Sequence, residues 1–181
     1  MAFTKLINHI NKITYHNTLK NIPDFNTENE KNLLNIFYMN IRSFNKNNLE
    51  LRIFLDSFNY KFDIIILVEI WANFQFSTDK DFEGYNYSYI INPYNKNGGV
   101  VIYSKKEFLI ENLDFEDCMK LEDKKNLDLL GLNLTIQNQH YAIIGLYNHN
   151  ANKIDSFKDL LLKVNNKFCK DKKIIVACDL R

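Results

Sequence analysis

Four polar side chains in this sequence stand where apolar stretches end, and their types could carry out phosphate chemistry. They are Asn40, Glu69, Tyr147 and Asp179. Each closes a stretch whose pattern predicts a β-strand, and sites in open α/β sheets collect just beyond the carboxyl ends of strands. If these ends share one edge, an amide, two carboxylates and a phenol converge there. Oxygen donors of this kind hold Mg²⁺, and such an ion can polarise a phosphodiester.

The clearest of these strands covers residues 62–68, with the sequence FDIIILV. A short aliphatic run rich in β-branched residues is typical of a strand that is buried on both faces. Glu69 follows at once, with Trp71 two residues later. Two interpretations of Glu69 are open at this stage: it carries function at the sheet edge, or it caps the strand and faces solvent.

The elements around this strand predict a parallel unit. Residues 33–40 form a strand pattern that ends at Asn40, and residues 41–46 are expected to be a loop. A helix is predicted next, because the apolar residues Leu49, Ile53, Phe54 and Phe58 recur at helical spacing. A strand–helix–strand unit of this kind places Asn40 and Glu69 at the same edge of the sheet.

The rest of the chain predicts two antiparallel hairpins, a helix and a last strand. Residues 87–91 and 100–104 form the first hairpin, and residues 127–136 and 140–147 form the second. The helix covers residues 154–168, and the last strand, residues 174–178, leads into Asp179; residues 105–125 show no firm pattern. Gly98 and Gly99 lie in a turn signal between the strands of the first hairpin, which explains two glycines more simply than phosphate binding does.

Composition sets limits on the class of protein. Of 181 residues, 46% are apolar and 25% charged, so the chain can bury a core, and a net charge of +1 argues against a purely electrostatic nucleic-acid binder. The sequence shows no signal peptide and no apolar run of membrane-spanning length. Three cysteines without CxxC spacing, at positions 118, 169 and 178, indicate neither a disulfide framework nor a zinc site. We therefore expect an intracellular protein, cytoplasmic or nuclear, without a disulfide-linked partner, in which residues 1–32 are a poorly ordered leader.

Three phrases, in this order along the chain, resemble a known family. They are Asn40-Ile41-Arg42-Ser43, residues 63–71 (DIIILVEIW) and residues 98–103 (GGVVIY). Together they are similar to phrases of the endonuclease/exonuclease/phosphatase superfamily, and most of all to the apurinic-endonuclease-like domain of non-LTR retrotransposons. The resemblance covers about residues 35–181. It implies a two-sheet α/β sandwich flanked by helices, incomplete at its C-terminus, with residues 33–181 as a partial domain.

The resemblance also implies a role for each of the four residues. Glu69 would be the metal ligand, and Asn40 its neighbour in the metal and phosphate site. Tyr147 would donate a hydrogen bond to the scissile phosphate, and Asp179 would orient the attacking water. The implied cofactor is Mg²⁺ or Mn²⁺, and the implied reaction is the nicking of DNA.

The sequence departs from the family pattern at three places. The two prolines expected after Tyr147 are replaced by residues 148–150 (NHN), and Arg181 stands where the family has an asparagine. The closing S-D-H phrase of the family would lie beyond position 181. No histidine of this chain occupies its place: His140 is expected at the surface, whereas His149 could approach the site. Activity is therefore expected to be impaired by truncation, and two alternatives remain: an inactive retroelement remnant that binds nucleic acid weakly at most, or a superfamily phosphatase.

Overall fold

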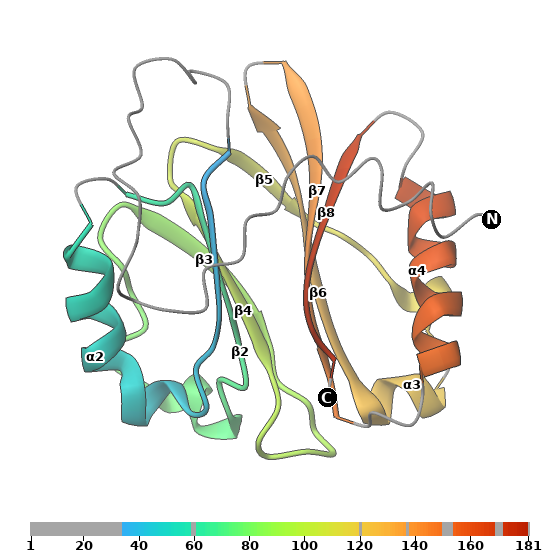
Figure 1. Ribbon diagram of the computed structural model, residues 1–181, viewed down its shortest axis with the longest axis horizontal. Coiled ribbons are helices and arrows are strands. Elements are labelled where there is room, and N and C mark those ends of the chain that lie inside the picture. The colour runs from blue at the N-terminus through green and yellow to red at the C-terminus, as the bar shows by residue number, and fades with distance from the viewer. Residues whose placement is uncertain are drawn as a thin grey trace. The chain divides into compact units, whose positions relative to one another are not determined.

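The structure, a computed structural model, describes residues 34–58, 61–119, 121–136, 138–149, 154–168 and 172–180. Eight strands in two sheets form the framework of these described residues. All of these residues belong to one unit, Leu34–Arg181. The predicted leader of residues 1–32 lies outside the described residues. The two sheets face each other, and helices lie on their outer sides (Figure 1).

The first sheet has the order β1-β2-β4-β3, with β1 (Ile36–Asn40), β2 (Ile64–Val68), β3 (Tyr85–Ile90) and β4 (Val100–Lys105). β1 and β2 are parallel, with Asn40 opposite Val68, as the strand–helix–strand pattern predicts. β4 pairs antiparallel with both β2 and β3. All five residues of β2 are buried, as expected for a central aliphatic strand.

The second sheet has the order β5-β6-β7-β8, with β5 (Leu109–Asn112), β6 (Leu127–Ile136), β7 (Gln139–Asn148) and β8 (Lys173–Leu180). β6 and β7 form the predicted antiparallel hairpin, and β8 runs parallel to β7. β5 arises in residues 105–125, where the sequence shows no firm pattern. Because β7 and β8 are parallel, Tyr147 and Asp179 face each other across the pair at the carboxyl ends of both strands.

The main core fills the space between the two sheets. Its fully buried aliphatic residues come from β2, β4, β6 and β7, and they include Ile64, Ile66, Ile102, Leu132 and Ile143. The sheets approach each other closely at Gly145, where an added Cβ would lie 2.8 Å from Val100 Cγ1 and 3.0 Å from Ile66 Cγ2. Glycine at this position therefore sets the spacing of the sandwich.

Helices cover the outer face of each sheet (Figure 1). α2 (Phe44–Asp56) and the short η2 (Ala72–Phe76) pack on the first sheet through Phe44, Leu51 and Phe74. α4 (Ile154–Phe168), the short η3 (Glu116–Cys118) and α3 (Leu121–Asn126) lie beside the second sheet, where Leu160 and Val164 of α4 are buried. None of these helices is long and apolar enough to cross a membrane, as far as the described residues go.

The start of α2 differs from the sequence prediction. The loop expected over residues 41–46 is wrong in its second half, because the helix already begins at Phe44. The run Asn45-Lys46-Asn47-Asn48 has weak helix propensity, which hid the start. Burial decides against propensity here: the Phe44 ring is fully buried and meets the Phe74 ring edge-on at 4.9 Å.

Candidate phosphodiesterase site

Asn40 holds the two carboxylates of the site together. Its Nδ2 donates to Glu69 Oε1 at 2.6 Å and to Asp179 Oδ2 at 2.7 Å. Its Oδ1 accepts the backbone N–H of Arg42 at 3.2 Å, which fixes the direction of the amide. Asn40 is the last residue of β1 and Glu69 follows β2, both in the first sheet, whereas Asp179 lies on β8 of the second sheet. The edge at which the strands end is therefore shared by both sheets.

Glu69 is a buried acid, and the backbone around it is strained. Its residue is 5% exposed, so the interpretation of Glu69 as a solvent-facing cap is wrong. Its φ is +55°, and Arg42, Ser43 and Trp71 nearby also have positive φ. Residues other than glycine rarely adopt such values, and clusters of them are found at functional sites. Four such residues follow β1 and β2, which indicates that this edge of the sheet is a functional site.

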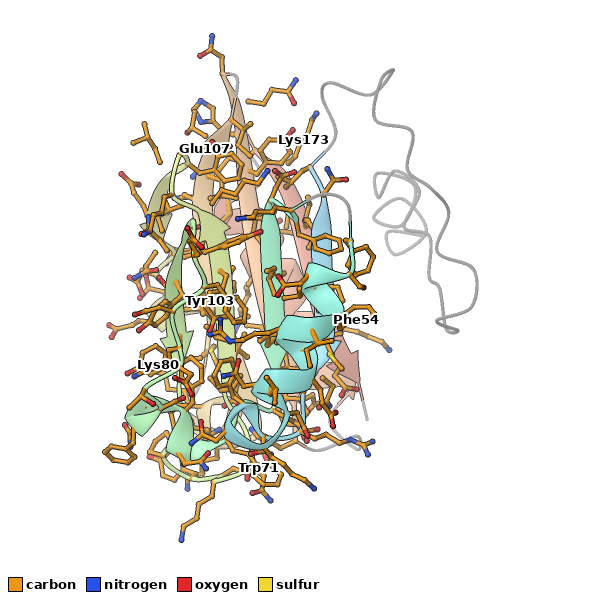
Figure 2. All side chains as sticks on the ribbon, turned by 90° about the vertical axis from the view of Figure 1, so that its left-hand side faces the viewer. Phe54, Trp71, Lys80, Tyr103, Glu107 and Lys173 are labelled. Atoms are coloured by element: carbon orange, nitrogen blue, oxygen red, sulfur yellow. The ribbon has the colours of Figure 1, made fainter. Side chains whose placement is uncertain are left out.

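Tyr147 completes the set that the sequence predicts. It lies beside Asp179 in the β7–β8 pair and is 6% exposed, in the core between the sheets. In Figure 2, Trp71, which lies two residues after Glu69, is at one end of the sheets, and Glu107 and Lys173 are at the other end. The four residues thus belong to one end of the sandwich. Their convergence is observed, whereas their catalytic roles stay predictions.

Tyr38 is a further group of this site that the sequence analysis missed. Its hydroxyl is buried and finds no hydrogen-bond partner among the described residues. Burial raises the pKa of this phenol, and the nearby charge of Asp179 raises it further, followed by smaller contributions that include Glu69. Tyr38 therefore stays protonated near the carboxylates. Strand alternation was a usable signal, because residues two apart in β1 share a face.

His149 belongs to a second polar cluster beside the site, and His140 does not. His149 Nε2 lies 2.8 Å from Asp128 Oδ2, and both side chains are almost fully buried. Its ring centroid lies 4.6 Å from that of Tyr147. His140 is exposed at the start of β7, as expected. The sequence analysis also missed Asp128, because it interpreted residues 127–136 only as a strand.

Arg181, which stands where the family has an asparagine, lies outside the described residues, as do His9 and His16.

The donor set fits a hard divalent cation. Within the described residues, no three side chains of His, Cys, Asp and Glu gather as a metal centre. Mg²⁺ is usually held by one or two carboxylates with water and phosphate, so the two carboxylates near Asn40 suffice. Asn40 itself turns its amide nitrogen, not its oxygen, toward them. In this arrangement the amide nitrogen bridges the two acids, and the roles of Glu69 and Asn40 as metal ligands stay predictions.

Comparisons with known proteins identify the fold. No protein-family model and no curated protein matches the chain. Among solved structures, the catalytic domain of human Nocturnin with bound sulfate is similar over 81% of this chain and 64% of its own, with 16% identity and a TM-score of 0.61. TDP2 from D. rerio with a single-strand DNA product matches over 81% and 60%, with 19% identity and a TM-score of 0.57. The endonuclease domain of TRAS1, a telomere-specific non-LTR retrotransposon, matches over 81% and 58%, with 12% identity and a TM-score of 0.54.

The chain has the endonuclease/exonuclease/phosphatase fold. The fold that the three sequence phrases predict is therefore confirmed. The chain spans less than two thirds of the length of each of these structures. In this copy of the endonuclease/exonuclease/phosphatase fold, the two acids and their asparagine stand at one end of the paired sheets.

Proposed function

We propose that this chain is a metal-dependent phosphodiesterase domain that nicks DNA, of the kind found in non-LTR retrotransposons. The observation that carries the proposal is the amide of Asn40 between the carboxylates of Glu69 and Asp179. The fold supports it, because similar structures include a retrotransposon endonuclease and a protein in complex with a DNA product. Several similar proteins thus act on nucleic acid.

The residues of the chain divide the work of in-line hydrolysis among them. Asp179 orients a water molecule and accepts its proton as the water oxygen bonds to phosphorus. Tyr147 donates a hydrogen bond to a phosphate oxygen as the bond from phosphorus to the leaving oxygen breaks. Asn40 keeps the two carboxylates at a set distance. When bound at Glu69, Mg²⁺ or Mn²⁺ supplies Lewis-acid polarisation of the phosphate.

The test is the nicking of supercoiled plasmid by the full chain with Mg²⁺, with Mn²⁺ and with EDTA. We expect nicking that EDTA abolishes and that Glu69→Gln lowers by about 10²-fold or more, because a charged group aimed at the reacting phosphate is lost. Glu111→Gln, an exposed glutamate on β5, is the matched control and should keep full activity.

Three results would change the assignment. Nicking that survives Glu69→Gln contradicts the role of this residue. A wild-type chain that never nicks DNA supports the inactive remnant. Hydrolysis of a soluble phosphomonoester in place of DNA supports a phosphatase.

A further inference from the structure

His149 lies between β6 and the loop that joins β3 to β4, residues 91–99, called here the rim loop. On one side its Nε2 lies 2.8 Å from Asp128 Oδ2. On the other side its Nδ1 lies 2.7 Å from Asn95 Nδ2 of the rim loop. Asp128 Oδ2 also accepts the backbone N–H of Gly99 at 2.7 Å. The imidazole thus ties the middle of the rim loop to the second sheet, and the carboxylate ties its end.

The partners of His149 decide which ring nitrogen carries the proton. Asn95 Oδ1 accepts the backbone N–H of Asn97 at 2.9 Å, so the amide of Asn95 turns its N–H₂ toward the ring. Nδ1 must then be the acceptor, and Nε2–H donates to Asp128. Asn92 Nδ2 also lies 3.3 Å from Nε2, and its N–H₂ can donate to the backbone oxygen of Lys124 instead. Both ring nitrogens are committed to hydrogen bonds, and the side chain is 8% exposed. His149 is therefore held in one tautomer and one orientation.

Gly98 makes this close approach possible. A Cβ at this position would overlap with Asp128 Oδ2 and with His149 Cε1, both side-chain atoms of the cluster. Gly98 has no positive φ, unlike Gly99, so the requirement here is space. Gly98 therefore lies in a sequence pattern typical of a turn, but it is the packing of Asp128 and His149 that requires glycine here.

The cluster touches both halves of the candidate site. The ring of His149 meets the ring of Tyr147 edge-on, at 87° and 4.6 Å between centroids. The rim loop accepts three hydrogen bonds from the chain after Glu69. Two are of 2.8 Å, from Trp71 N to Gly98 O and from Ala72 N to Lys96 O, and one is of 3.5 Å, from Ile70 N to Gly99 O. A movement of His149 would displace the Tyr147 ring through direct contact. It would also displace the backbone that follows Glu69, through the hydrogen bonds of the rim loop.

We propose that His149 is a positioning residue of the site: clamped between Asp128 and the rim loop, its ring holds Tyr147 in the orientation from which the phenol meets a phosphate. The inference rests on the proposed function for its catalytic consequence. The physical reason is that an aromatic ring packed edge-on restricts the rotation of its neighbour, and a misplaced donor loses much of its effect.

Two variants separate the hydrogen bonds of His149 to Asp128 and Asn95 from the contact of its ring with Tyr147. His149→Gln keeps an amide N–H that can donate to Asp128 but removes the ring that packs on Tyr147. His149→Phe keeps a ring but removes both hydrogen bonds. His140→Gln, an exposed histidine at the other end of β7, is the control. The readouts are kcat and KM of plasmid nicking, the NMR resonances of the Tyr147 ring, assigned by their loss in Tyr147→Phe, and hydrogen exchange of the Gly99 amide.

We expect His149→Gln to lower kcat about tenfold or more with little change in KM, to shift the Tyr147 resonances and to leave the Gly99 amide protected. In a Tyr147→Phe background, His149→Gln should cause no further loss, because the group that it positions is gone. His149→Phe should expose the Gly99 amide to exchange. If that variant does not fold, because Asp128 loses one of its two hydrogen-bond partners, the glutamine variant still tests the proposal.

Two results would overturn it. One is an additive loss of kcat in the double variant, which would mean that His149 acts independently of Tyr147. The other is an unchanged Tyr147 ring spectrum in His149→Gln. If the wild-type chain does not nick DNA, the proposed function fails, and the ring spectrum alone decides whether His149 positions Tyr147.

Discussion

Single residues of the rim loop show how tightly the backbone beside the site is constrained. Gly98 and Gly99 are neighbours, yet they are glycines for different reasons. Gly99 has φ +95°, which side chains rarely adopt, and an added Cβ there would also lie 2.8 Å from Ile70 Cγ1. Gly98 needs no special φ and leaves room for Asp128 and His149. A sequence pattern registers both as turn residues. Only the contacts show that Gly98 is part of the cluster that adjoins Tyr147.

Gly98→Ala should lower the free energy of unfolding by about 1–3 kcal/mol, because the added methyl group overpacks a buried cluster. Urea denaturation measures this loss, and hydrogen exchange of the Gly99 amide should show that the rim loop loosens. Gly84→Ala is the comparison: Gly84 has φ +85° but nothing within 4 Å of an added Cβ. It should cost about 1 kcal/mol and leave the Gly99 amide protected. Equal protection of Gly99 in both variants would contradict this account.

At the level of elements, β2 carries the site. The strand is buried on both faces between α2 and the second sheet, and Glu69 follows its last residue. Ile66, at the middle of β2, packs against Gly145 of the second sheet. The rigidity of β2 therefore sets where the acid stands.

Ile66→Ala should lower the free energy of unfolding by about 2–5 kcal/mol, since it leaves a cavity between the sheets. Ile53→Ala in α2 is the matched control: Ile53 is 64% exposed, so the same substitution should change stability by less than about 0.5 kcal/mol. Urea unfolding curves of both variants measure the difference. Equal losses would mean that the core does not lie between the sheets as described.

At the level of the whole molecule, buried phenols make stability depend on alkaline pH. Burial, then the charge of Asp63, raises the pKa of Tyr85 from 10.0 to about 12, and its hydroxyl donates to the backbone oxygen of Phe62. Burial also raises the pKa of Tyr38 and of Tyr103. A phenol whose pKa is raised by folding binds its proton more tightly in the folded state. Its contribution is complete below pH 10 and is lost as pH rises through the folded pKa.

We therefore expect the melting temperature to fall steeply between about pH 10 and pH 12. Tyr85→Phe should lower the melting temperature at pH 8, through loss of the hydrogen bond to Phe62, but should show a shallower fall above pH 10. Calorimetry from pH 7 to pH 11.5 measures both. The difference between the two proteins should stay constant from pH 7 to pH 9, which serves as the internal control; parallel curves above pH 10 would refute the assignment.

Much of the fold could be predicted because its signals are local. Aliphatic runs predicted β2 and β8, alternation predicted the β6–β7 hairpin, and helical spacing predicted α4 at residues 154–168. The start of α2 could not be predicted from propensity, because its asparagines favour other conformations and burial of Phe44 decides the matter. β5 was missed for a similar reason: its pairing with β6 is not visible in its own sequence.

By itself, the sequence determined which chemical groups stand at the ends of strands: an amide, two carboxylates and a phenol. Only the tertiary structure decided that one amide nitrogen bridges both acids, since Asn40 and Asp179 are 139 positions apart and belong to different sheets. It also decided that Tyr38 lies near the acids and that His149 is held between Asp128 and the rim loop. The physical reason is that strand ends are set by local hydrophobic patterns, whereas contacts between sheets depend on how the two faces pack.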